Sequence, residues 1–154
     1  MGTSDASSNL SMKERWEKGL LWVDTGENLN QQIFARGLCQ DFNQTRATES
    51  EKRAGICKKL FASCGENVWI EPPLTVAMGN TVSIGDNTYI NSNLTLVDDY
   101  KIHIGTGVLI APNVTISTTN HPMHYKARTV KCTAKKLLSR IMCVLEATLS
   151  SALA

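Results

Sequence analysis

Residues 70–116 read IEPPLTVAMGNTVSIGDNTYINSNLTLVDDYKIHIGTGVLIAPNVTI, and in this stretch similar residues recur every six positions. One ladder consists of Ile70, Val76, Val82, Thr88 and Leu94, and a second of Met78, Ile84, Ile90 and Leu96. After a short break both ladders resume, with Ile102, Val108 and Val114 and with Ile104, Ile110 and Ile116. A period of six fits neither a helix, with about 3.6 residues per turn, nor an ordinary strand, with about two. It indicates an internal repeat, and short repeats build solenoids.

The repeat predicts a mainly β solenoid whose coil has three flat sides, each a short strand of about six residues. The aliphatic residue at one fixed position of each side points into the core and stacks on its equivalent in the next coil. Asn and Asp cluster near the predicted corners, because they tolerate unusual backbone angles and bond the local backbone. The alternative is an antiparallel β-domain with regular short strands. Two six-spaced ladders in one register disfavour it.

The segment before the repeat predicts three short amphipathic helices after a loose tail at residues 1–10. Ser11 to Glu14 has the pattern of a capping box, and Thr48 to Glu51 has it again. The apolar residues expected to face the core are Trp16, Leu20 and Leu21, then Leu29, Ile33, Leu38 and Phe42, then Ile56, Leu60 and Phe61. These helices contain too little apolar surface to fold alone, so we expect them to pack against the solenoid.

The composition of the chain excludes several classes of function. The chain has 154 residues, 42% hydrophobic and 19% charged, which is typical of a soluble globular domain. A net charge of +2 argues against a nucleic-acid-binding protein. Five cysteines without a C-x-x-C pair argue against a zinc site or a disulfide scaffold and are typical of a reducing compartment. There is no secretory signal or apolar run of membrane-spanning length, so we expect a cytoplasmic protein without membrane or metal partners.

Longer strings within the repeat resemble a known family. Ile84 to Asn87 (IGDN) and Ile104 to Gly107 (IGTG) are similar to the hexapeptide repeat of left-handed parallel β-helix acyltransferases. FASCGENVWIEPP from Phe61, YINSNLTLVDDY from Tyr89 and VLIAPNVTISTTNHPMH from Val108 resemble the galactoside and maltose acetyltransferase branch. The resemblance implies a helical region at 11–66, a left-handed β-helix at 67–128 and a sugar O-acetyltransferase that uses acetyl-CoA as co-substrate. It also implies a homotrimer with active sites between subunits.

The resemblance also implies site residues. His121, in Asn-His-Pro, matches the general base of the family, and a neutral imidazole is suited to accept the proton of a sugar hydroxyl. Asp24, Tyr89, Asn91 and Asp99 match positions that line the acceptor pocket. Asn and Asp suit a sugar because its hydroxyl groups need both acceptors and donors. No residue of this sequence is matched to acetyl-CoA, and the acceptor sugar is not specified.

The sequence departs from the family pattern at residues 129–154, an aberrant C-terminal tail without hexapeptide periodicity. In the family this region continues the coils that form most of the CoA channel. A truncated, non-catalytic family member, either a pseudoenzyme or an assembly partner, is therefore the alternative function. Our hypothesis is that the tail is a frame-shifted translation, because codons for residues 144–154 can encode IGGNVIICPG in another frame; the nucleotide sequence of codons 125–154 tests it. The sequence is compatible with either a helical or a disordered tail.

Overall fold

The structure is a computed structural model, and it describes residues 10–18, 20 and 22–119. Three helices come first: α1 (Met12–Glu17), α2 (Gly26–Asn43) and α3 (Ser50–Leu60). The strands are β1 (Ser63–Cys64), β2 (Trp69–Ile70), β3 (Leu74–Val76), β4 (Val82–Ile84), β5 (Tyr89–Ile90), β6 (Leu94–Val97), β7 (Ile102–Ile104), β8 (Leu109–Ile110) and β9 (Thr115–Ser117). The predicted tail at 129–154 lies outside the described residues.

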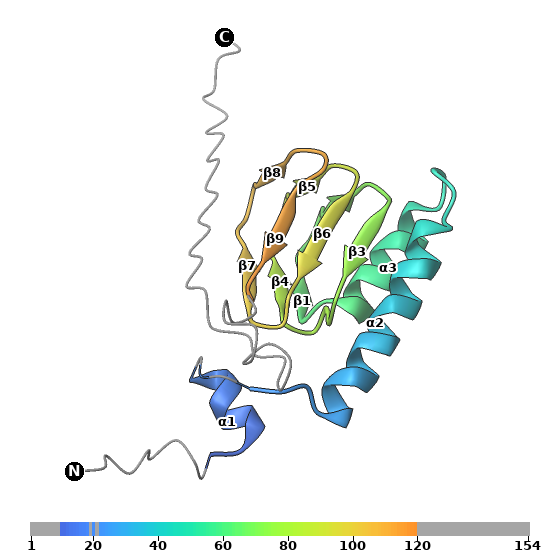
Figure 1. Ribbon diagram of the computed structural model, residues 1–154. Helices are drawn as coiled ribbons and strands as arrows, with labels where there is room; N and C mark the ends of the chain where they lie inside the picture. The colour runs from blue at the N-terminus through green and yellow to red at the C-terminus, as the bar shows by residue number, and fades with distance from the viewer. Residues whose placement is uncertain (1–9, 19, 21, 120–154) are drawn as a thin grey trace, which may run out of the picture.

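The strands form a parallel solenoid, as predicted (Figure 1). Every third strand pairs in parallel, giving sheet 1 (β1, β4, β7), sheet 2 (β2, β5, β8) and sheet 3 (β3, β6, β9). Paired residues are 20 positions apart throughout, as in Ile70↔Ile90 and Ile90↔Ile110. The pairing begins at Ser63, ahead of the predicted boundary at residue 67.

The 20-residue coil contains one side longer than the six residues predicted. The inward residues Cys64, Ile70 and Val76 are six apart, whereas the step from Val76 to Ile84 is eight. The extra residues lie in the long corners between sheet 3 and sheet 1, namely residues 77–81 and, one coil later, residues 98–101. The six-residue spacing is nevertheless unbroken across the first of these corners. Val82 and Ile84 lie two apart on β4 and are both buried, so one ladder continues through Val82 and the other through Ile84.

Stacked aliphatic side chains fill the solenoid, as expected. The buried core includes Ile70, Leu74, Val76, Val82, Ile84, Ile90, Leu94, Leu96, Ile102 and Ile104. Four asparagines adopt positive φ: Asn67, Asn87, Asn93 and Asn113. Their side chains pair between coils, with 2.7 Å from Asn93 Nδ2 to Asn113 Oδ1. The predicted role of Asn at corners is confirmed at these positions.

Helices α2 and α3 cover the first coil (Figure 1). Helix α2 packs against β3 and α3, and α3 packs against β1. At the end of α2, the Asn43 side chain accepts a hydrogen bond from the N–H of Leu74 (2.7 Å) and donates one to the Leu74 carbonyl (2.9 Å). An edge strand with free backbone groups invites pairing with another chain. The side-chain amide of Asn43 bonds the edge of β3 as the backbone of a neighbouring strand would, so these two groups of Leu74 are not free to pair with another chain.

Two details of the helix prediction are wrong. The buried face of α2 is formed by Ala35, Cys39 and Phe42, and the predicted core residues Leu29 and Ile33 are 49% and 67% exposed. The sequence of α2 has more than one apolar stripe, and packing on β3 selects one of them. Thr48 does not cap α3: the N-cap is Glu49, whose carboxylate accepts a hydrogen bond from the N–H of Arg46 (2.7 Å).

The apolar face predicted for α1 is also not found as predicted, because α1 has no buried residue and ends at Glu17, before Leu20. The remaining helix predictions agree with the structure. Ser11 and Glu14 form the capping box of α1, and Ile56, Leu60 and Phe61 are buried. The described cysteines, Cys39, Cys57 and Cys64, are free thiols. Burial raises the pKa of Cys57 to about 12, so this thiol is protonated and unreactive at neutral pH. Within the described ranges, no helix is long and apolar enough to cross a membrane.

Candidate functional site

Asp99 lies at the second long corner, where three segments of the chain meet. Its carboxylate accepts a hydrogen bond from the Thr119 hydroxyl (Oδ2 to Oγ1, 2.7 Å), and its carbonyl accepts one from the indole N–H of Trp16 in α1. The Trp16 ring also packs on Tyr100, with 5.0 Å between centroids. Thr119 precedes His121 by two residues in the sequence. His121 itself lies outside the described residues, so its predicted role stays a prediction.

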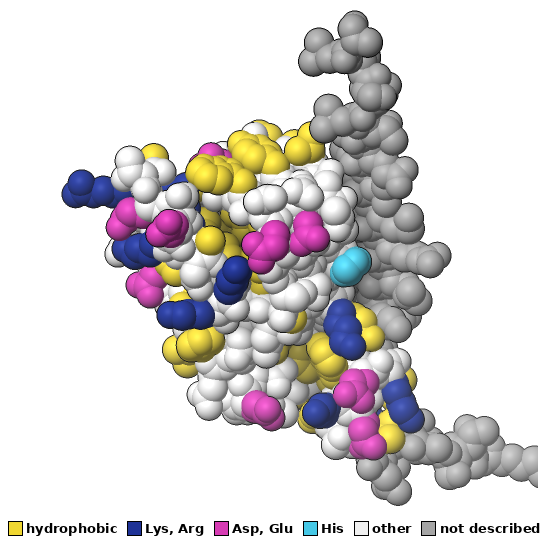
Figure 2. Space-filling model, turned by 180° about the vertical axis from the view of Figure 1, so that it is seen from behind, with side chains coloured by type: hydrophobic (Ala, Val, Ile, Leu, Met, Phe, Trp, Pro, Cys, Tyr) yellow, Lys and Arg dark blue, Asp and Glu magenta, His cyan; other side chains and the backbone are white. Residues whose placement is uncertain are grey.

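Tyr89 and Asn91 lie at a different part of the solenoid. Tyr89 is on the outer face of sheet 2, in register with Trp69 and Leu109, and these three side chains are between 36% and 52% exposed. They form an exposed apolar strip along the sheet, and Figure 2 shows hydrophobic side chains gathered along the upper edge of the face it presents. Asn91 follows β5 directly, and its side-chain oxygen accepts a hydrogen bond from the N–H of Ser92 (2.8 Å).

Asn91 and Asp99 lie at opposite ends of β6 within one chain. Strand β6 separates them, and its four residues span roughly 13 Å at about 3.3 Å per residue. Asn91 is at the corner between sheets 2 and 3, whereas Asp99 is at the corner between sheets 3 and 1. The structure therefore brings Asp99 towards the segment that leads to His121, but it does not bring Asn91 there.

Asp24 precedes α2, in the connection from α1. One oxygen of its carboxylate, Oδ1, is buried and has no hydrogen-bond partner among the residues that the structure describes. A buried acceptor without a donor is costly.

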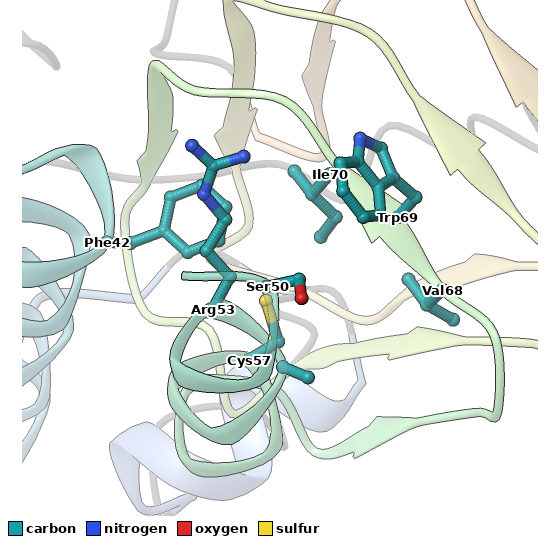
Figure 3. A pocket seen from close by; sticks show the side chains of 8 residues that line it. Phe42, Ser50, Arg53, Cys57, Val68, Trp69 and Ile70 are labelled. Carbon is teal, nitrogen blue, oxygen red and sulfur yellow. The ribbon is translucent and has the colours of Figure 1, made fainter. Parts of the chain in front are cut away.

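Two hollows lie between α3 and β2, and Trp69 of the apolar strip lines both of them. The smaller, of about 20 Å³, lies beside Arg53, and the larger, of about 250 Å³, opens between Cys57 and Cys64. Figure 3 shows the Arg53 guanidinium over the Phe42 ring, and its Cζ atom lies 5.9 Å from the ring centroid. Neither hollow contains a predicted site residue.

Arg53 itself has a structural role at this place. Its Nε donates to the Thr45 hydroxyl (2.7 Å), and its guanidinium lies 3.6 Å from the carboxylate of Glu71. These contacts join α3 to the turn after β2. The described residues also contain no cluster of His, Cys, Asp and Glu suited to a metal ion.

Trp16, Thr119 and the buried Asp98 were not predicted as parts of the site. The signal that could have found two of them is the coil length, because Asp98 and Asp99 stand 20 residues before Thr118 and Thr119. Trp16 carries no such signal, since its contact joins residues 83 positions apart.

Comparisons with known proteins agree with this fold. Residues 24–65 match the maltose acetyltransferase hexapeptide capping motif, which covers α2, α3 and β1. A galactoside O-acetyltransferase of Escherichia coli (strain K12) is 46% identical over 121 residues, which are 78% of this chain and 60% of the relative. The chain therefore spans less than two thirds of that relative.

Solved structures give the same result. A galactoside acetyltransferase in complex with coenzyme A superposes with a TM-score of 0.79 at 41% identity, over 82% of this chain and 64% of the other. A hexapeptide-repeat-containing acetyltransferase of Vibrio cholerae complexed with acetyl coenzyme A superposes with a TM-score of 0.72 at 30% identity, over 82% and 69%. These relatives have the left-handed parallel β-helix that the sequence predicts. The chain belongs to the hexapeptide-repeat-containing acetyltransferases, and it is similar to the galactoside acetyltransferases among them.

Proposed function

We propose that the protein transfers an acetyl group from acetyl-CoA to a sugar hydroxyl. The observation that carries the proposal is the hydrogen bond between Asp99 and Thr119. It joins a carboxylate predicted to bind sugar to a residue two positions before His121. The names of the relatives support the reaction class: one is a galactoside acetyltransferase bound to coenzyme A and another an acetyltransferase bound to acetyl coenzyme A.

The proposed chemistry is direct transfer. His121 accepts the proton of the sugar hydroxyl while the oxygen attacks the thioester carbonyl of acetyl-CoA. The carbon–sulfur bond then breaks, the acetyl ester of the sugar forms, and the thiolate of CoA leaves and takes up a proton. The step requires no covalent enzyme intermediate and no metal.

The acceptor sugar is held by oxygen acceptors and an apolar surface. Asp24, Asn91 and Asp99 bind sugar hydroxyls through their side-chain oxygens. Tyr89, which is 36% exposed, offers the face of its ring to the ring carbons.

The working form that we propose is a homotrimer. Asn91 and Asp99 lie at opposite ends of β6, so a pocket that uses both needs Asn91 from one copy and Asp99 from another. The exposed apolar strip on sheet 2 is suited to lie against a neighbour. We place the protein in the cytoplasm, without nucleic-acid or membrane partners, because its described cysteines are free thiols and its net charge is small.

A complementation experiment tests the reaction and the shared site together. Asn91→Ala and Asp99→Ala should each lower acetyl transfer to galactosides, maltose or glucose by roughly 10- to 100-fold, as expected for a lost polar contact to substrate. The two variants are then mixed in denaturant and refolded together. Random assembly places an intact Asn91 against an intact Asp99 at about a quarter of the sites, so about a quarter of the wild-type rate should return.

The release of CoA thiol measures the rate, and light scattering measures the mass of the assembly. Each variant refolded alone is the control. A wild-type protein that transfers no acetyl group contradicts the proposed reaction. A mixture no more active than its two components contradicts the shared site.

A further inference from the structure

Asp98 is fully buried, and its carboxylate is surrounded by donors from the preceding coil. Oδ1 accepts hydrogen bonds from the backbone N–H groups of Ala77 and Met78 (2.9 Å each). Oδ2 accepts from the N–H of Gly79 (2.7 Å) and lies 2.6 Å from the Thr81 hydroxyl. A buried carboxylate is stable only when such donors replace water. Here they all come from the first long corner, residues 77–81.

The donor set explains why an acid stands at this position. The corner presents three consecutive N–H groups and a hydroxyl, and an ionised carboxylate is the side chain that can accept from all four. Asp98 therefore fixes the path of the first long corner and, through the same bonds, its own backbone one coil later. The Thr81 hydroxyl also lies 2.6 Å from the Asp98 carbonyl, so its single proton can be donated to either oxygen of the same residue.

The same corner is attached to α2. The carbonyl of Met78 accepts a hydrogen bond from the side-chain amide of Gln31 (2.7 Å). Helix α2 begins at Gly26, two residues after Asp24. Asp98 is thus linked in one direction to the helix that follows Asp24, and in the other to Asp99, its neighbour in the chain.

The next coil repeats the arrangement with a smaller side chain. Thr118, 20 residues after Asp98, is buried, and its hydroxyl accepts a hydrogen bond from the N–H of Tyr100 (2.9 Å). Each buried side chain at this position therefore holds the long corner of the coil before it. Between them, Asp98 and Thr118 fix the backbone on both sides of Asp99.

We infer that Asp98 is a positioning residue of the acceptor site: its buried carboxylate holds the long corners so that Asp99 faces Thr119 and α2 holds Asp24 in place. The inference rests on the proposed function, in which Asp99 and Asp24 bind the sugar. Asp98 itself does not touch the substrate, because its carboxylate is enclosed by the first long corner.

Asp98→Asn tests the clamp without requiring activity. Asn keeps the size but has one acceptor oxygen, so its NH2 group would face a donor of the corner. The amides of residues 77–79 should exchange with deuterium at least roughly tenfold faster, measured by NMR in the full chain. The matched control is Asp86→Asn, because Asp86 also accepts a backbone N–H across coils (Glu66, 2.8 Å) but is exposed at another corner.

Thr81 provides a milder pair of variants in case Asp98→Asn fails to fold. Thr81→Val keeps the shape and removes the hydroxyl, whereas Thr81→Ser keeps the hydroxyl. Thr81→Val should show the faster exchange of residues 77–79, and Thr81→Ser should restore slow exchange.

The kinetic measurement separates positioning from stability. Asp98→Asn and Thr81→Val should raise the KM for the acceptor sugar by roughly tenfold or more, since a displacement on the order of 1 Å is costly in a site. The KM for acetyl-CoA should stay unchanged, and Asp86→Asn and Thr81→Ser should match the wild type. A loss of active protein would instead lower the apparent kcat and leave both KM values alone.

Each outcome decides the inference. Faster exchange with an acceptor-specific rise in KM supports it, and unchanged exchange or an unchanged acceptor KM overturns it. If the wild type neither transfers acetyl groups nor binds sugars, the proposed function fails, and with it the role of Asp98 in an acceptor site. The exchange data then report separately on whether Asp98 holds the corner.

Discussion

His121→Ala should lower kcat/KM for acetyl transfer by roughly 100- to 10,000-fold, the usual contribution of a positioned general base. A sugar hydroxyl is a weak nucleophile, and without a base its proton must be lost to water as the oxygen attacks the thioester. The segment that carries His121 follows Thr119, which is bound to Asp99, so the base is expected to act beside the sugar-binding corner. Release of CoA thiol in the presence of acetyl-CoA and a galactoside measures the effect.

His103→Ala is the matched control for this experiment. His103 is exposed on β7, paired with Ser83, and has no part in the proposed site. Its replacement should leave kcat/KM unchanged. The role of His121 is disproved if both variants retain the wild-type rate, or if both lose it to the same extent.

Gly79→Ala should destabilise the protein by about 2–5 kcal/mol, the sum of left-handed backbone strain and overpacking. Gly79 has φ +73° and lies where α3 meets the solenoid. An added Cβ would lie 2.4 Å from the carbonyl oxygen of Leu60 and 2.7 Å from its Cδ1. The carbonyl belongs to the last residue of α3 and cannot move without the helix. The corner that Asp98 holds would also shift, because the Gly79 N–H is one of its donors.

Gly107→Ala separates the two causes. Gly107 has φ +70°, but an added Cβ would meet no atom within 4 Å, so this variant has the backbone strain without the clash. We expect it to cost about 1–2 kcal/mol. Thermal unfolding followed by circular dichroism compares the two, and the midpoint for Gly79→Ala should lie several degrees or more below that for Gly107→Ala. Equal midpoints would show that α3 yields to the added methyl group.

Much of the fold could be predicted because its signals are local and repeated. The six-residue ladders predict the parallel solenoid, and Ser11 with Glu14 predicts the start of α1, since each signal lies within a few residues. The eight-residue side could not be seen in the same way. Strand side chains alternate with a period of two, so two extra residues leave the apolar pattern in phase.

The errors in the helical region have a tertiary cause. Leu29 and Ile33 are as apolar as Ala35 and Cys39, and only contact with β3 decides which face of α2 is buried. Thr48 has the residue type of an N-cap, but Glu49 takes that position with a bond to Arg46. A short polar segment offers several such bonds of similar free energy, and packing selects among them.

The sequence by itself determined the repeat and the class of coil, because apolar periodicity and corner asparagines act within one or two coils. Tertiary structure alone decided which residues meet. It placed Asp99 against Thr119 and Trp16, and it put Asn91 at the far end of β6. The contact of Asp99 with Thr119 depends on the length of the coil, which the pairing of the strands sets. The contact with Trp16 depends on the docking of α1, which leaves no mark in the residues on either side.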